Sequence, residues 1–349
     1  MAHPTRWVTL LAAAAAVACG GDAPPGEGEA RAATPVPGEV RVLIATADAR
    51  IGEIADLVVD AEGTVYAVDR QAAEIHVVDA SGRVTSFGRP GAGPGEYARP
   101  SALEVLGDTL LVVDWGNGRL QGVTRTGEPL FTRGLPPGQA PAIGAGGWMV
   151  RPTWGNDTVL AVIHAPDLAS VAGIGRIAGT PTGTVYPRSM KEEIRQGKVP
   201  AIFLNMAEAV LGPDSTTWLY VQARGTVQRF DAAGRELFAV AVQEPEADGL
   251  LQAFMDANAA LPVGSFAPLS YVAAATLVGE DLWLLLGHSR SGPTSVRVLR
   301  GDGSWGPRLE FPGVTGASRL AVDLPRGVVY FVRGDAAELV RVPLPDPLP

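Results

Sequence analysis

The stretches ADLVVDAEGTVYAVDRQAAEIHVVDASGRVTSF (residues 55–87) and SALEVLGDTLLVVDWGNGRLQGVTRTGEPLFT (101–132) decide the fold of this chain. Each reads as a strand, a glycine turn, a second strand ending in aspartate, a short loop, a third strand, another glycine turn and a fourth strand. The glycines of the last turns, Gly82 and Gly127, are 45 residues apart. A four-strand repeat of this length is typical of one blade of a β-propeller.

The same unit continues along the rest of the chain. A degenerate unit covers 141–178, and clearer units cover 205–242 and 270–311. The last unit, 317–344, has only three strands. We therefore predict an all-β fold, a six-bladed β-propeller. A β-sandwich or an open solenoid is the alternative, but a sandwich does not need four-strand repeats and a solenoid would need polar caps.

The segment EVRVLIAT (39–46) reads as a strand that belongs to no unit. An open ring would leave an unpaired strand edge, and propellers often avoid this by letting one terminus complete the blade of the other. We expect this N-terminal strand to become the fourth strand of the last blade. The propeller domain is therefore predicted to cover 39–349.

Two segments between blades do not follow the strand pattern. Residues 189–197 contain a capping box, Ser189 with Glu192, and are predicted to form a short helix. Residues 246–261 are predicted to form a second, amphipathic helix. Its apolar face contains Leu250, Leu251, Phe254 and Leu261. Insertions at these places lie on one rim of the disc, either as a packing cover, which we favour, or as a lid over a binding site.

The second blade resembles the NHL repeat. In DTLLVVDWGNGRLQGV (108–123), Asp114, Asn117 and Arg119 match its aspartate, asparagine and arginine, whereas the first blade keeps only Asp69. The linker 87–103 is similar to that of six-bladed propeller lipoproteins of unassigned function. The resemblance implies an interaction platform, although lyases and lactonases are among the relatives. An aspartate at a strand end can also simply accept backbone N–H groups and hold a blade in register.

The N-terminus resembles a bacterial lipoprotein signal peptide. Residues 1–18 contain a short positive region and an apolar stretch that is too short to span a membrane, and they end in small residues before Cys19, the only cysteine. We predict lipid attachment at Cys19; an ordinary signal peptide with a chance cysteine is the alternative. Residues 19–38 are rich in small, proline and acidic residues and are expected to form a flexible tether.

These features predict an exported protein that is anchored to a membrane by lipid, on the periplasmic face of the outer membrane or on the cell surface. The net charge is −9, and no cluster of lysine and arginine stands out. Nucleic acid is therefore excluded as an expected partner, because its phosphates need a positive surface.

Four polar residues fall on the strands that should line the central channel. They are Asp56, Glu104, Glu208 and Arg319. A carboxylate cluster of this kind is a candidate for acid–base catalysis. Calcium-dependent lactonases of this fold need Glu, Asn and Asp side chains that converge at the channel mouth, and no set of asparagines joins the four. We predict no cofactor, with calcium as the alternative.

Histidine and tryptophan residues give two further hypotheses. His76, His164 and His288 occupy different places in the strand pattern, so we expect no three-histidine metal site. Trp115 follows a strand end and should be exposed in a loop, where, with Asn117, it could anchor a ligand or partner.

Two functions follow from this interpretation. The first is a binding or scaffold propeller in the cell envelope that recognises a protein, peptide or glycan. The second is a propeller enzyme, a lactonase or a lyase, with its site in the central channel. We favour the first, because no catalytic motif identifies an activity.

Overall fold

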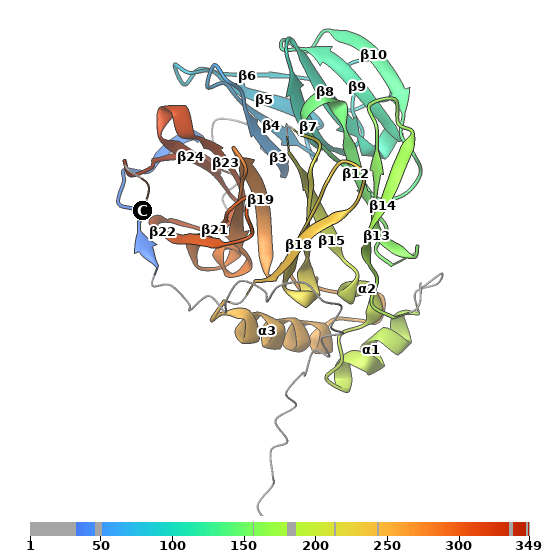
Figure 1. Ribbon diagram of the computed structural model, residues 1–349. Coiled ribbons are helices and arrows are strands. Elements are labelled where there is room, and N and C mark those ends of the chain that lie inside the picture. Colours follow the sequence, from blue (N-terminus) through green and yellow to red (C-terminus); the bar gives the residue numbers. More distant parts are fainter. Residues whose placement is uncertain are drawn as a thin grey trace, which may run out of the picture.

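The protein folds as a ring of six sheets, as the computed structural model shows (Figure 1). The structure describes residues 33–45, 51–155, 157–179, 186–212, 214–242, 244–334, 338–346 and 348. The sheets confirm the predicted six-bladed β-propeller. Cys19 and the expected signal peptide lie outside the described residues. Within these residues, no helix has the length and apolar character needed to span a membrane.

The first three blades each contain four strands, numbered here from the axis outward. Blade one consists of β3 (Ile54–Val59), β4 (Val65–Asp69), β5 (Glu74–Val78) and β6 (Val84–Phe87). Blade two consists of β7 (Pro100–Leu106), β8 (Thr109–Asp114), β9 (Arg119–Thr124) and β10 (Pro129–Gly134). Blade three consists of β11 (Ala142–Ile143), β12 (Met149–Pro152), β13 (Val159–His164) and β14 (Ser170–Arg176). The short β11 agrees with the weak repeat signal of this unit.

The last three blades complete the ring. Blade four consists of β15 (Ala207–Leu211), β16 (Thr217–Val221), β17 (Thr226–Phe230) and β18 (Glu236–Ala241). Blade five contains β19 (Val272–Val278), β20 (Asp281–Leu286), β21 (Pro293–Leu299) and β22 (Trp305–Thr315). Blade six contains β23 (Ala317–Asp323), β24 (Val328–Arg333), β25 (Glu338–Pro343) and, from the N-terminal side of the chain, β2 (Arg41–Ile44).

The N-terminal strand closes the ring as predicted. β2 pairs antiparallel with β25, so that Arg41 lies opposite Arg341 and Val42 opposite Val340. Ile44 is only 2% exposed and packs among apolar side chains of blades six and one. The first and last parts of the chain thereby share one sheet, in which β2 serves as the outer strand of blade six.

The chain joins the fold earlier than expected. A two-residue strand, β1 (Thr34–Pro35), pairs parallel with β22, and Val36, 2% exposed, donates its N–H to the Glu310 carbonyl at 2.7 Å. Residues 34–36 were expected within a tether that ends at residue 38. Burial of Val36 in the core between blades five and six explains the difference, because this apolar side chain gains more from packing than from staying in solvent.

The turns between third and fourth strands explain the repeated glycines. In blade one, Asp79 accepts the N–H groups of Ser81 and Arg83, and Gly82 takes a φ of 87°. Asp231 and Gly234 repeat this geometry in blade four, where the glycine φ is 81°. Glycine is favoured at such left-handed positions because it lacks a Cβ.

The core consists of apolar layers between neighbouring blades. Leu103, Leu110 and Tyr66 belong to the layer between blades one and two, and the other blade pairs have equivalent layers. The strands nearest the axis are rich in alanine, for example Ala55 and Ala102, which are buried. Small side chains fit there because the sheets converge toward the axis.

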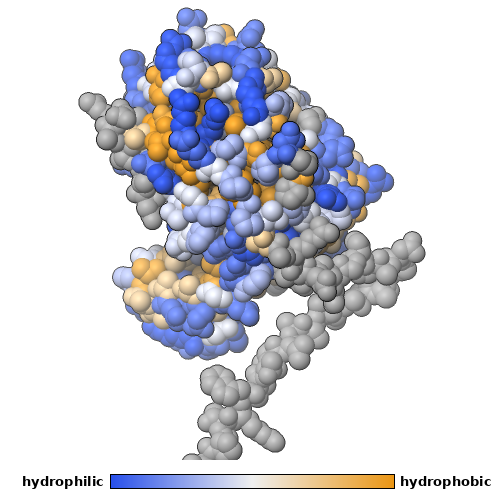
Figure 2. Space-filling model, turned by 90° about the vertical axis from the view of Figure 1, so that its left-hand side faces the viewer, coloured by the Kyte–Doolittle hydropathy of each residue, from blue (hydrophilic) through white to orange (hydrophobic). Residues whose placement is uncertain are grey.

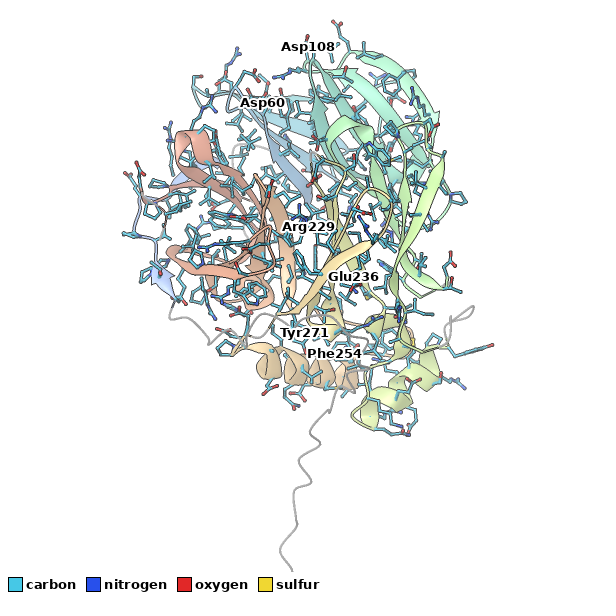
Figure 3. All side chains as sticks on the ribbon, viewed as in Figure 1. Asp60, Asp108, Arg229, Glu236, Phe254 and Tyr271 are labelled. Carbon is cyan, nitrogen blue, oxygen red and sulfur yellow. The ribbon has the colours of Figure 1, made fainter. Side chains whose placement is uncertain are left out.

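Helices lie beside blades four and five at the rim where the inner strands begin. α1 (Pro187–Arg195) and α3 (Ala247–Ala260) confirm the two predicted helices, and the short α2 (Ala201–Leu204) was not predicted. Phe254 of α3 packs on Phe203 with ring centroids 5.2 Å apart, and it lies near Tyr271, where the helices meet the propeller (Figure 3). Figure 2 shows the helices as a lobe beside the propeller. This apolar packing supports the interpretation as a cover.

Two details of the helices differ from the sequence prediction. α1 begins at Pro187, and Ser189 donates its hydroxyl to the Tyr186 carbonyl, so the capping box of Ser189 and Glu192 is wrong. Proline favours the first helical position because its missing N–H would be unpaired there. Leu261 follows the end of α3 and is exposed, whereas Asn258 is buried on the inner face.

Ring closure by β2 gives a stability prediction. Ile44→Ala should lower the free energy of unfolding by about 2–4 kcal/mol, because it leaves a cavity between blades six and one. Val42→Ala, on the same strand but 44% exposed, is the matched control and should change little. Urea unfolding followed by tryptophan fluorescence measures both. Equal effects of the two substitutions would contradict closure by this strand.

Candidate functional site

The inner strands of all six blades surround a cavity of about 650 Å³ along the propeller axis. Its volume is in the range of small-molecule sites in proteins. The four predicted channel residues, Asp56, Glu104, Glu208 and Arg319, all line it. The sequence pattern therefore placed these polar groups correctly in one cavity, although they come from four different blades.

Asp56 and Glu104 form a carboxyl pair on blades one and two. The carboxylate of Asp56 accepts the N–H groups of Leu57 and Leu103, both at 2.9 Å, so it bridges the two inner strands. Burial raises the pKa of Asp56, against the opposing effect of these two N–H donors and of Arg319. Burial and the negative charge of Asp56 raise the pKa of Glu104 to about 7. Glu104 can therefore hold or release a proton near neutral pH.

Glu208 on blade four lies across the ring and is held in place by hydrogen bonds. Tyr220 donates its hydroxyl to Glu208 Oε2 at 2.8 Å, and Gln222 donates Nε2 to Oε1 at 3.0 Å. Gln222 is itself fixed, because it bonds both the N–H and the carbonyl of Val272. Burial, and then the Glu208 charge, raise the pKa of Tyr220 well above its usual value. The tyrosine is therefore a neutral hydrogen-bond donor.

Two arginines bring positive charge to this region. Arg319 donates Nε to the Ala55 carbonyl at 2.6 Å and Nη1 to the Ser318 carbonyl at 2.7 Å, which fixes its guanidinium between blades six and one. Arg290 follows β20 in the 3₁₀ turn Gly287–Arg290 and donates to the Ala273 carbonyl. Burial and the nearby charge of Arg319 lower the pKa of Arg290. An anionic group in the channel would be stabilised by the charge of Arg319, which lines the cavity.

The mouth of the cavity contains strained backbone. Arg99 and Trp154 both line the cavity and have φ angles of 57° and 51°. A non-glycine residue with such a positive φ reduces the folding stability by about 1–3 kcal/mol, and such residues are often found at functional sites. The Arg99 guanidinium lies 4.8 Å from the centre of the Trp115 ring, and Trp115 donates to the Gly138 carbonyl at 3.3 Å. Trp115 thus forms part of the channel mouth.

Asn117 and the other NHL-like residues mainly hold blades together. Asn117 donates Nδ2 to the carbonyl of Gly91 and to Asp114, each at 2.8 Å. Arg119 donates to Asp114 at 2.8 Å and to three carbonyls of the linker from blade one. These contacts favour the structural interpretation of the motif over a binding role for Asn117.

The histidines occupy separate local networks. His76 contacts Ser86 at 2.7 Å and Asp69 at 3.4 Å, all within blade one. His164 contacts the Leu168 carbonyl, and His288 contacts Ser295. Among the described residues, no group of three or more His, Cys, Asp or Glu side chains could hold a metal ion.

Tyr220, Gln222 and Arg290 are functional candidates that the sequence pattern does not reveal. Tyr220 lies on a second strand rather than an inner one, and Arg290 lies in a loop. Of the three, Tyr220 lines the cavity, Gln222 holds Glu208, and Arg290 brings its charge close to Arg319, so each role depends on side-chain reach across neighbouring strands. Two-residue alternation along a strand cannot predict this reach.

Comparisons with known proteins show the fold. No protein-family model matches the chain, and no curated protein sequence matches it. Among solved structures, it is similar to a putative exported protein from Bacteroides fragilis (10% identity, 88% of this chain and 94% of that one, TM-score 0.55). It is also similar to the calcium-binding protein regucalcin from Agrobacterium tumefaciens (15% identity, 89% of this chain and 95% of that one, TM-score 0.52). A third similar structure is a gluconolactonase from Xanthomonas campestris (14% identity, 88% of this chain and 90% of that one, TM-score 0.51).

The raised pKa of Glu104 predicts a stability change with pH. The pKa is about 7 in the folded chain, against 4.5 for an unperturbed glutamate, so the folded state favours the protonated form. Stability should fall as pH rises from the unfolded pKa through the folded pKa, by up to about 3 kcal/mol from this residue. Glu104→Gln should remove this loss.

The measurement is urea unfolding at about pH 5 and about pH 9. Glu104→Gln should gain stability relative to the original chain at the higher pH and much less at the lower pH. Glu280→Gln, at an exposed turn, is the control and should keep the original pH dependence. A parallel pH dependence in all three proteins would show that Glu104 ionises normally.

Proposed function

We propose that this protein is an enzyme that uses general acid–base catalysis on a small polar substrate in the central channel. One observation carries this proposal: a carboxyl group with a pKa of about 7, Glu104, lies beside a second carboxyl group inside a cavity of about 650 Å³. A catalytic acid or base works best when its pKa is near the working pH. Perturbed carboxyl pairs in cavities are characteristic of catalytic sites.

Hydrolysis of a lactone is the reaction that fits these groups best. Glu104 in its ionised form takes a proton from water, and the water oxygen bonds to the acyl carbon. The ring C–O bond then breaks and Glu104 returns the proton to the leaving oxygen, which gives a hydroxy acid. Arg319 would stabilise the negative charge that develops on the carbonyl oxygen. A lyase that abstracts and returns a proton could use the same groups.

Calcium was the alternative cofactor, and regucalcin, one of the similar structures, is described as calcium-binding. The residues of this channel do not fit such a site. The described carboxylates do not form a group of three, and Asp56 already accepts two backbone N–H groups. No step of the proposed reaction passes through calcium.

A second candidate function is recognition of a protein partner by the outer surface. Large apolar side chains are exposed on the outer strands of blades one to four. They are Val84, Leu130, Phe131, Val171 and Leu237. Leu130 and Phe131 are consecutive on β10, whereas the others lie one to a blade, so blade two offers the strongest candidate for a patch that binds a partner. This surface is separate from the channel, so it is compatible with catalysis.

Export and lipid attachment complete the proposal. The signal-like residues 1–18 and the single cysteine support an anchored protein whose propeller works in the cell envelope. Peptide and glycan partners, suggested by the sequence, have no separate support from the geometry.

Activity can be tested with lactones. The full chain should hydrolyse a sugar-acid δ-lactone or an aromatic lactone, measured as acid release with a pH indicator. Glu104→Gln should lower the rate by about 10²–10⁴-fold because it removes the proton-transfer group. The rate of the original chain should rise with pH through about pH 7, as Glu104 ionises.

Glu280→Gln serves again as the control and should keep the full rate. Equal rates for Glu104→Gln and the original chain would exclude the proposed role of this residue. If no lactone is hydrolysed and no elimination substrate is consumed, the enzyme proposal fails and the partner surface becomes the better explanation.

Lipid attachment can be tested independently. Cells that express the full chain and grow with radiolabelled palmitate should label the protein, and Cys19→Ser should abolish this labelling. The membrane fraction should then lose the protein, because the lipid on Cys19 is the predicted anchor and the apolar stretch before it is too short to span a membrane. Palmitate incorporation in Cys19→Ser would contradict attachment at this residue.

A further inference from the structure

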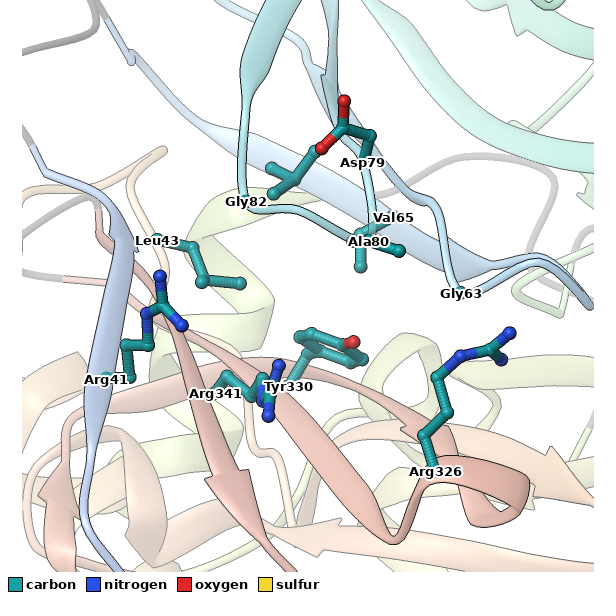
Figure 4. A pocket seen from close by; sticks show the side chains of 11 residues that line it. Arg41, Leu43, Gly63, Val65, Asp79, Ala80, Gly82, Arg326, Tyr330 and Arg341 are labelled. Carbon is teal, nitrogen blue, oxygen red and sulfur yellow. The ribbon is translucent and has the colours of Figure 1, made fainter.

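A second, smaller pocket lies where the ring closes, between blade six and blade one (Figure 4). Its volume is about 40 Å³. A water molecule needs roughly 10–15 Å³ on this measure, so the space fits one group of a few heavy atoms. Figure 4 shows Arg41, Arg341 and Tyr330 on one side of the gap, with the blade-one turn that contains Asp79 and Gly82 on the other.

Arg41 and Arg341 place two positive charges next to each other. They are direct partners across the β2–β25 pair, and Tyr330 on β24 is the partner of Arg341. Directly opposite residues of antiparallel strands point to the same face, so the three side chains form a row that faces blade one. Like charges in this arrangement repel each other and destabilise the strand pair.

The guanidinium groups of Arg41 and Arg341 make no hydrogen bond or ion pair with another residue among those that the structure describes. Arg326, which also lines the pocket, does have such partners. Arg326 pairs with Asp323 at 3.0 Å and donates to the Ala61 carbonyl at 3.1 Å. The repulsion between Arg41 and Arg341 thus has no compensating acid among the residues that the structure describes.

The opposite wall leaves the space open. Gly63 has a φ of 84°, and a Cβ there would lie 2.5 Å from Arg326 Nε, so a larger residue would clash. Gly82 lies so close that a Cβ would be 3.5 Å from an Arg41 Nη atom. The one carboxylate in the wall, Asp79, is already bonded to Ser81 and paired with Arg83 at 3.1 Å. The pocket therefore keeps two uncompensated positive charges.

We propose that this pocket binds a phosphate group. Two adjacent guanidinium groups can each give parallel N–H donors to a tetrahedral oxyanion, and its two negative charges match theirs. Binding removes the repulsion between Arg41 and Arg341. Because Arg41 belongs to β2 and Arg341 to β25, the bound group stabilises the strand pair that closes the ring. This proposal does not depend on catalysis in the channel.

The phosphate can come from two sources, free inorganic phosphate or the monoester headgroup of a lipid such as phosphatidic acid. Both offer the same tetrahedral group. A soluble ion would act as a stabilising ligand, whereas a lipid headgroup would hold this seam against a membrane surface.

The experiment uses the full chain with Cys19→Ser, so that attached lipid does not contribute. Inorganic phosphate at saturation should raise the melting temperature by about 2–4 °C over chloride at equal ionic strength. Isothermal titration should give one phosphate per chain. The double substitution Arg41→Gln with Arg341→Gln should abolish both signals, and it should melt no lower than its parent without phosphate, because the repulsion is gone.

Arg235→Gln is the matched control. Arg235 is an exposed arginine that pairs with Asp231 in the equivalent turn of blade four, and its loss should leave phosphate binding unchanged. Binding that persists in the double variant but ends in Arg319→Gln would place the anion in the channel and overturn the proposal. Absence of any phosphate effect on the parent protein would overturn it as well.

Vesicles separate the two sources. Binding to phosphatidic acid vesicles but not to phosphatidylcholine vesicles, lost in the double variant, would assign the pocket to a lipid headgroup. Phosphate binding without vesicle binding would assign it to the free ion.

Discussion

Pairing of β2 with β25 is the contact on which the rest of the structure depends. Blade six would otherwise end in an unpaired strand, and the apolar layer between blades six and one would be open to water. The inner strands that line the channel meet at this same seam, where Arg319 of blade six donates to the Ala55 carbonyl of blade one. Closure therefore determines where the charged groups of the channel lie, and not only how stable the fold is.

Buried aspartates at strand ends connect the blades around this ring. Asp69 accepts the N–H groups of Gly52 and Glu53, and Asp114 accepts the N–H of Ala98, so each fixes the chain that enters its blade. His76 contacts Asp69 in blade one, and Gln121 contacts Asp114 in blade two. Gln121 thus contacts the buried aspartate of its blade from the same strand position as His76. The contacts among Ser86, His76 and Asp69 are therefore better explained as part of the blade structure than as a nucleophilic triad.

Much of the fold could be predicted because it depends on local pattern. Glycine turns, strand alternation and an unassigned N-terminal strand were sufficient for six blades and their closure. The channel residues Asp56 and Glu104 also followed from alternation. The pKa of Glu104 could not be predicted, because it depends on burial and on the distance to Asp56. Nor could β1, since a pairing of two residues with a distant strand leaves no periodic signal.

Several unfavourable features of the channel support the proposal that it is the functional site. Glu104 is half-buried beside another carboxyl group, and two of the five described non-glycine residues with a positive φ, Arg99 and Trp154, line the same cavity. Each feature reduces stability, and none of them is needed to close a ring that is held by apolar layers between all its blades. Several destabilising features at one site are expected where a protein binds a ligand or catalyses a reaction. A channel kept only as a packing solution would be lined by neutral side chains that satisfy one another.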